Sequence, residues 1–597
     1  LAYLYKSIKL SGGGAIIAES LGGRPLRPDT EDFHEKRLLN IVEEMAIASG
    51  MPVPQVYLLD DEIGINAFAA GYQPSDAIIG VTKGCLTKLS RRQLQGVIGH
   101  EFSHILNGDM RLNMRLIAIL FGILCIGLLG RMILEVGTRH SIMSRGKNSK
   151  SIFTSSSNNK KEGGIPLFFL GIGLMVLGYS GVFFGKLIQS AVSRQREYLA
   201  DASAVQFTRD PHAIAEALKV IGHGGVGSAI GHSGREEFSH AFFGDAISHH
   251  LGMSIGFLST HPKLDERIRR IDKRWNGEWI APQTLKQAYD ESPKLASKSK
   301  IRPEEVLTGL AAAMTAAIDF PGAGNNNSQN NDELSSEQNL ENDQIENTAQ
   351  LSIEELELAL TDAAHDPKSA RALCYALLIA PDTSLVHEKQ LDLISEYCGG
   401  SLLQEVNRLL AIIGQLEDTL GLALVDKSIP ALKLLSGEKY EEFKKLLVKL
   451  VQADGKIDLF EWCIYRMILQ YLNPTFGKAK AIKAKYGNAE KIQAEIETVL
   501  SFVANHGHDS LEKAMESFNT GAETAGFSGL SLQPRTESFK AFNIALDTLT
   551  QAYPHIKGRI MKALATCIKV HGIQTAEKEL VQTIAAILEC PTPDLFD

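Results

Sequence analysis

The stretch SRRQLQGVIGHEFSHILNG, residues 90–108, decides how the first half of this chain folds. Ser90 is a typical N-cap residue, and Asn107-Gly108 is a typical helix end. Between them, apolar residues recur at helical spacing, namely Leu94, Val97, Ile98, Phe102 and Ile105. The stretch therefore predicts one helix with the motif HEFSH inside it.

The HEFSH motif predicts a metal site. His100 and His104 are four residues apart, so both imidazoles project from one face of the helix and can hold one ion. Glu101 lies beside them, where its carboxylate can accept a proton from an attacking water. The alternative is a surface helix with incidental histidines. If this side of the helix is buried and no metal is bound, two histidines and a glutamate are left without partners, which is costly.

A catalytic zinc usually has three protein ligands and one open position, so a third ligand is needed from elsewhere. Glu197, in SRQREYLADASAV, is the best candidate. Asp201 stands one helical turn later on the same face, where it can accept the second ring N–H of a ligating histidine. The alternative is that both acids are solvated and paired with Arg194 and Arg196.

Composition narrows the class of protein. The 597 residues carry a net charge of -9 with no basic footprint, which argues against nucleic acid as the main partner. The seven cysteines are scattered and form no C-x-x-C pair, so they indicate neither a disulfide framework nor a cysteine zinc site. We interpret them as small core residues in a reducing compartment.

Two apolar runs lie between the predicted ligands. Residues 112–134 and 165–185 predict a transmembrane hairpin, and only a hairpin brings HEFSH and Glu197 to the same membrane face. A pair of buried core helices is the alternative.

An amphipathic helix over 31–49 and short strands over 55–59 and 77–81 predict a small α+β layer before the motif.

The rest of the chain predicts a mainly α fold. We expect a metallopeptidase domain over residues 1–290, including the hairpin, and a helical extension over 291–320. Residues 321–350 are rich in Asn, Gln, Ser and acids and predict a disordered linker. Residues 351–597 predict a separate all-α domain.

Several motifs occur together in one order: INAFAAGYQPSDAIIGVTKGCLTKLSRRQLQGVIGHEFSHILNGD, REYLADASAV and THPKLDERIRRI. In this combination the chain resembles the HtpX-like and CAAX-prenyl-protease-like family of membrane zinc metallopeptidases, over about residues 50–275. The resemblance implies one Zn²⁺ per chain, held by His100, His104 and Glu197, with Glu101 as general base.

The same resemblance implies a substrate cleft. Asn66 to Gly71 is similar to the family's strand beside the cleft, where an extended peptide could add as a further strand. A plain sheet strand is the alternative. His261 and Arg267, in HPKLDER, would stabilise the oxyanion. The alternative for His261 is a residue that only leads into a helix.

The C-terminal stretch LVKLVQADGKIDLFEW, residues 447–462, is similar to the TerB-like helical domain. Asp454, Asp458 and Glu461 could approach a divalent cation there, although their spacing is not that of an EF-hand. An ordinary capped helix turn is the alternative. This domain could also bind a protein partner.

We therefore expect a zinc endopeptidase that cleaves membrane or misfolded proteins, in the bilayer of a bacterial inner membrane. The alternatives are a zinc-stabilised scaffold with an idle centre and a prenyl-peptide processing enzyme. The segment between the two spans is rich in Arg and Lys, and its positive charge predicts that this segment lies in the cytoplasm. The family resemblance instead implies that the catalytic side faces the cytoplasm. We follow the resemblance and expect the catalytic and C-terminal domains in the cytoplasm.

Overall fold

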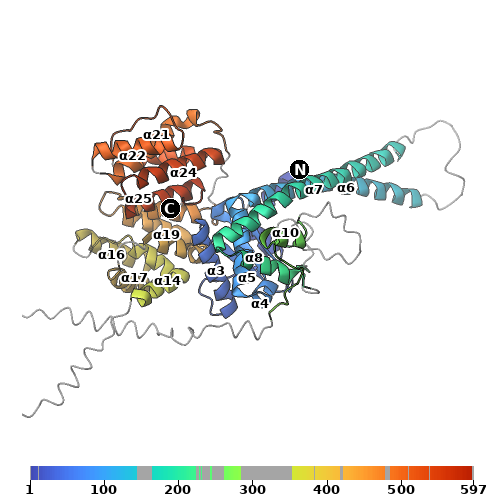
Figure 1. Cartoon of the computed structure of the whole chain (residues 1–597), viewed down its shortest axis with the longest axis horizontal. Helices are drawn as coiled ribbons and strands as arrows, with labels where there is room; N and C mark the ends of the chain where they lie inside the picture. The colour runs from blue at the N-terminus through green and yellow to red at the C-terminus, as the bar shows by residue number, and fades with distance from the viewer. Residues whose placement is uncertain are drawn as a thin grey trace, which may run out of the picture.

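A computed structural model shows an N-terminal domain (residues 2–283) beside an all-helical C-terminal domain (residues 353–593) (Figure 1). The structure describes residues 2–10, 13–143, 164–223, 227–228, 230–231, 242–244, 261–283, 353–381, 384–416, 421–477, 484–508, 510–536 and 538–593. The predicted mainly α fold is confirmed. The predicted extension (291–320) and linker (321–350) lie outside the described residues.

The sheet has the strand order β1-β2-β4-β3. Its members are β1 (Arg24–Pro25), β2 (Gln55–Leu59), β3 (Ala67–Ala70) and β4 (Ile78–Thr82). β2 and β4 pair in parallel with Tyr57 opposite Gly80, whereas β1 and β3 run antiparallel to their neighbours. The two strands predicted from sequence thus form the centre of the sheet, and the segment 66–71 contains the edge strand β3.

Helix α5 (Arg91–Leu106) is the centre of the N-terminal domain, because α3 (Phe33–Ser49), α7 (Gly164–Thr208) and α8 (Pro211–Ile221) all pack on it. The remaining helical elements are α1 (Ala2–Leu10), α2 (Gly14–Ser20), η1 (Pro74–Asp76), α4 (Lys83–Lys88), α6 (Asp109–Met143) and α10 (Leu264–Ile271).

The ends of α5 are fixed as its sequence predicts. The Ser90 hydroxyl accepts from the Gln93 N–H, and the Gln93 side chain accepts from the Ser90 N–H, which forms a capping box. Gly108, at φ 69°, follows the last turn. The predicted apolar face is buried. A Cβ on Gly96 would come within 2.5 Å of the Ile214 nitrogen, so this glycine lets α8 approach closely.

Helices α6 and α7 pack side by side and project as one long arm, away from the C-terminal domain (Figure 1). A Cβ on Gly178 of α7 would overlap the Gly127 backbone of α6, so two glycines make the crossing possible. Among the described residues, Asp109–Glu135 is the helix long and apolar enough to span a bilayer, whereas the apolar stretch Phe169–Gly185 is shorter. Many apolar side chains on the arm are exposed, including Leu129, Phe169 and Phe184.

The C-terminal domain buries one large apolar core. Its elements are α14 (Ile353–His365), α15 (Pro367–Ala376), α16 (Leu385–Cys398), α17 (Gly400–Ile413), α18 (Gly421–Leu432), α19 (Gly437–Val451), α20 (Leu459–Leu472), η5 (Ala489–Ile492), α21 (Gln493–Gly507), α22 (Leu511–Thr524), α23 (Phe539–Leu549), α24 (Pro554–Lys569) and α25 (Thr575–Leu588). Amphipathic helices with a continuous apolar face account for this packing.

The acidic turn at 454–461 forms local hydrogen bonds. Asp454 accepts from the Lys456 N–H, and Asp458 and Glu461 form a capping box at the start of α20. These contacts favour the capped-turn interpretation over a cation site.

Candidate metal centre

Three side chains converge between α5 and α7. Nε2 of His100 and Nε2 of His104 are 3.2 Å apart. The Glu197 carboxylate lies 3.7 Å from the first and 3.6 Å from the second. Zinc bonds of about 2.0–2.1 Å in a tetrahedron place ligand atoms roughly 3.3 Å apart. The three residues therefore fit one small cation.

The hydrogen bonds behind the histidines strengthen this fit. Nδ1 of His100 is 3.0 Å from Asp201, and Nδ1 of His104 is 2.9 Å from Asp109. Because each carboxylate accepts a hydrogen bond from an Nδ1–H, the lone pair of each ring lies on Nε2 and points toward the other ring. Two lone pairs and the Glu197 carboxylate, packed together, repel one another unless a cation lies between them.

Burial keeps the first histidine neutral, as a metal ligand must be. The His100 side chain is fully buried, and desolvation lowers its pKa to about 4, although Asp201 and Glu197 act in the opposite direction. A neutral imidazole at ordinary pH is free to donate its lone pair.

Arg267 organises the buried acids. Its guanidinium donates to both oxygens of Asp201, at 2.9 and 2.6 Å, and to the Phe243 carbonyl at 3.1 Å. It also lies 3.4 Å from Glu197. Since Arg267 is 1% exposed and its donors face these groups, it lies behind the His-His-Glu group. Its contacts favour a positioning role over the oxyanion role that the resemblance implies.

Glu197 is held in its charged form. Burial alone would raise its pKa, but the nearby His261 and Arg267 outweigh that effect and hold the pKa below its usual range. Nδ1 of His261 is 3.1 Å from the Glu197 carboxylate, so this histidine lies at the centre.

Glu101 is buried beside the His-His-Glu group, and neither of its carboxylate oxygens has a hydrogen-bond partner among the described residues. Burial raises the pKa of Glu101 to about 7, and Glu197 adds to this rise while His104 and His261 oppose it. A carboxylate without a partner and with a pKa near neutrality suits proton transfer.

One wall of the centre comes from a segment that the sequence did not single out. The Phe243 ring lies edge-on to His100, with centroids 4.9 Å apart, and beneath the guanidinium of Arg267. The Phe243 N–H donates to Ala67, and Phe242 bridges to Phe68 of β3. This segment therefore covers part of the edge strand where a substrate strand was expected.

The structure brings together every residue that the sequence proposed for the site: His100, Glu101, His104, Glu197, Asp201, His261 and Arg267. Pairing of Glu197 and Asp201 with Arg194 or Arg196 is not what the structure shows, because both acids are buried and face His100 and Arg267.

Sequence reasoning missed Asp109 and Arg196. Asp109 supports His104 and forms an ion pair with Arg196. A signal was available, because Asp109 is the first acid after the Asn107-Gly108 stop that ends the motif helix.

A metallopeptidase centre is defined by two histidines on an HExxH helix, a glutamate from a second helix and a further buried carboxylate beside them. The family model of peptidase family M48 matches residues 33–275. The chain is 32% identical over 262 residues to a protease HtpX homolog of Bacteroides fragilis, covering 43% of this chain and 74% of that protein. The chain belongs to peptidase family M48.

Two further relatives carry the same description. The protease HtpX homolog of Caldanaerobacter subterraneus subsp. tengcongensis is 37% identical over 273 residues, which is 45% of this chain and 80% of that protein. The homolog of Dictyoglomus thermophilum is 36% identical over 284 residues, covering 46% and 78%. No solved structure matches. The chain is thus a metallopeptidase of the HtpX-like kind, and the scaffold and prenyl-peptide alternatives are not favoured.

Proposed function

We propose that this chain is a membrane-embedded zinc endopeptidase in which His100, His104 and Glu197 hold one Zn²⁺. The observation that carries the proposal is the convergence of two Nε2 lone pairs and one carboxylate at 3.2 to 3.7 Å. Nitrogen and oxygen donors in this number suit zinc and leave one coordination position open.

The protein's own groups account for the proton transfers. When bound, zinc would supply Lewis acidity that polarises the scissile carbonyl and the attacking water. Glu101 accepts the proton of that water and passes it to the leaving amine. Asp201 and Asp109 hold the two imidazoles in the tautomer that presents Nε2. His261, whose Nδ1 faces Glu197, would donate to the oxygen that becomes negative through its other ring nitrogen.

The substrate is a protein segment in extended form, from a membrane or misfolded protein. The Phe243–Ala67 hydrogen bond and the Phe68–Phe242 bridge pair the 242–243 segment with the outer edge of β3, so this edge accepts an antiparallel strand. A peptide strand would pair there by main-chain hydrogen bonds, which recognise backbone rather than sequence.

The membrane assignment rests on the arm of α6 and α7, with its exposed apolar side chains and one stretch, Asp109–Glu135, of spanning length. The two ends of the arm return to the same body, so a membrane that holds the arm leaves the metal centre on one side. The C-terminal domain contacts that body and therefore shares its side. Seven free cysteines favour the cytoplasm for the metal centre and the C-terminal domain.

Protease added from outside sealed cells tests this orientation. It should leave the C-terminal domain intact, and digestion of that domain would refute the orientation.

The enzyme itself is tested with detergent-purified full-length chain. We expect about one zinc per chain and cleavage of casein. Glu101→Gln should keep the zinc and lose cleavage, whereas Glu197→Ala should lose both. The matched control is Glu44→Gln, which changes an exposed acid paired with Arg91 on the outside of the domain. Zinc bound with cleavage indifferent to Glu101→Gln would overturn the mechanism.

A further inference from the structure

The C-terminal domain contacts the N-terminal domain through polar groups at several separate points. The contacts are Lys433 Nζ to the Ser75 carbonyl at 3.1 Å, the Thr592 N–H to the Gly50 carbonyl at 3.0 Å, His365 to Glu43 at 2.7 Å and Arg111 to Glu589 at 3.6 Å. They join residues more than 300 positions apart, from several elements of each domain. They thus define a specific face rather than one chance contact.

Arg111 connects this face to the metal centre. Its Nε donates to the Tyr72 carbonyl at 2.8 Å, and its Nη2 lies 3.6 Å from Glu589. Arg111 is in the first turn of α6, two residues after Asp109, and Asp109 holds the ring of His104. One helical turn therefore carries both the support of a metal ligand and the contact with the C-terminal domain.

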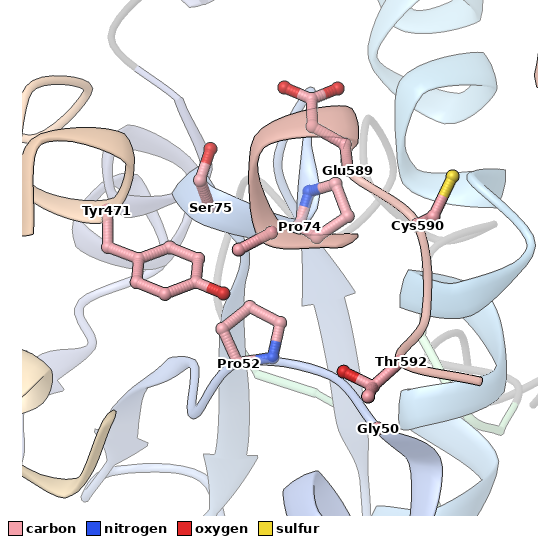
Figure 2. Close-up of a pocket in the computed structure, with 9 residues that line it drawn as sticks. Gly50, Pro52, Pro74, Ser75, Tyr471, Glu589, Cys590 and Thr592 are labelled. Atoms are coloured by element: carbon pink, nitrogen blue, oxygen red, sulfur yellow. The ribbon is translucent and has the colours of Figure 1, made fainter. Parts of the chain in front are cut away.

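The turn after the edge strand is held in the same way. Asp76 accepts from the N–H groups of Tyr72 and Gln73, which fixes the turn that leaves β3. Lys433 of the C-terminal domain then binds the Ser75 carbonyl in that turn. Figure 2 shows Tyr471 of α20 directed at the space between Pro52 and Pro74, with Glu589 on another side of the small pocket.

The charged side chains at this face are buried, which indicates a specific contact between the two domains. Lys433 is 8% exposed, and the Glu589 side chain is 6% exposed. Burying an ammonium or a carboxylate is costly unless a matched group faces it. The Ser75 carbonyl faces Lys433 and Arg111 faces Glu589, both from the N-terminal domain, while Lys557 of the C-terminal domain also acts on Glu589.

We propose that the C-terminal domain is an intramolecular brace for the peptidase site, with Arg111 and Glu589 as positioning residues. By holding the Tyr72–Asp76 turn and the first turn of α6, the domain fixes the end of the substrate-pairing strand and the orientation of His104. The docking part stands on the contacts alone, and the effect on the site rests on the proposed function.

The docking is tested in the full chain. A recognition sequence for a site-specific protease is inserted between residues 330 and 331, and the purified protein is cut and captured by a tag on its N-terminal part. We expect the C-terminal part to stay bound. Lys433→Met with Glu589→Arg should release most of it. The matched control Asp547→Arg breaks an exposed ion pair inside the C-terminal domain and should release none.

Two further variants guard against misfolding. Arg111→Met changes the opposite side of the contact and should also weaken retention of the C-terminal part. Lys433→Arg keeps a donor at this position and should leave retention unchanged. Gel filtration of the released part checks that it remains monodisperse. Separation of the unsubstituted halves on cutting, or retention by the double variant equal to the control, would overturn the docking.

The effect on the site is tested with uncut Glu589→Arg. We expect KM for a peptide substrate to rise several-fold with a smaller change in kcat, and zinc to pass to a chelator several-fold faster than in Asp547→Arg. Release of the domain with KM and zinc loss unchanged would overturn the brace. An unsubstituted protein without zinc or cleavage would refute the proposed function instead, and the capture experiment would still decide the docking.

Discussion

His104 and Asp109 lie 2.9 Å apart, Nδ1 to Oδ2, across the break between α5 and α6, so the helix that follows the motif supports the motif's last histidine. The other histidine has a matching support, Asp201, from α7. Each proposed ligand ring is therefore oriented by a carboxylate from a different helix.

The Asp109 support predicts a loss of metal affinity. Asp109→Asn keeps the shape but can turn an N–H toward Nδ1, which would favour the wrong tautomer of His104. We expect zinc affinity to fall about 10–100-fold, as is usual for such supporting carboxylates. Competition with a chromophoric chelator measures it. Asp60→Asn, at an exposed acid near β2, is the control and should change nothing. Equal affinity in both variants would contradict the role of Asp109.

Removing Arg267 should destabilise the fold rather than only slow the reaction. Arg267→Met leaves the buried Asp201 and Glu197 without their cation. The loss of one partner from a buried ion pair typically costs about 3–5 kcal/mol. Urea unfolding of the detergent-purified protein measures this cost. If stability is unchanged while kcat falls, Arg267 acts directly on the reacting atoms, and the positioning interpretation is wrong.

The crossing of α6 and α7 depends on glycine. Gly178→Leu would force the two helices apart, because even a Cβ at this position overlaps the Gly127 backbone. We expect a lower midpoint of thermal unfolding in detergent and a lower yield of folded protein. Gly173 has nothing within 4 Å of an added Cβ, so Gly173→Leu is the matched control and should be tolerated. Equal losses in both variants would show that the crossing does not depend on this contact.

Docking of the C-terminal domain should strengthen as the pH falls. Burial raises the pKa of Glu589 to about 7 from an ordinary 4.5, while Lys557 and Arg111 lower it and Asp76 raises it. Between those values the docked state binds a proton that an exposed carboxyl does not, so docking is strongest below about pH 4.5 and weakest above pH 7.

Retention of the cut C-terminal part, measured at pH 5.5 and pH 7.5, tests this dependence. We expect several-fold weaker retention at the higher pH. Burial lowers the pKa of Lys433 to about 8, so this amine stays charged over most of that range and contributes little. Glu589→Gln should flatten most of the dependence. Burial also raises the pKa of Asp76, and the His365–Glu43 pair lies on the same face. An unchanged slope in Glu589→Gln would place the titrating group elsewhere.

The sequence by itself determined the helix of the motif, its two histidines and Glu101, because helical spacing places residues four apart on one face regardless of context. It also determined Glu197 and Asp201 as a pair one turn apart, and the apolar arm by length and composition. These are local properties of the chain, and the structure brings the residues to one centre.

Only the tertiary structure decided what surrounds that centre. Three contacts join distant segments: the Arg196–Asp109 pair spans 87 residues, the Phe243–His100 contact 143 and the Arg111–Glu589 contact 478. No periodicity links such residues, because their contacts depend on how α5, α6, α7 and the C-terminal domain pack. Burial then sets the chemistry, since the protein interior, and not the sequence, makes Glu101 and Glu589 hard to ionise.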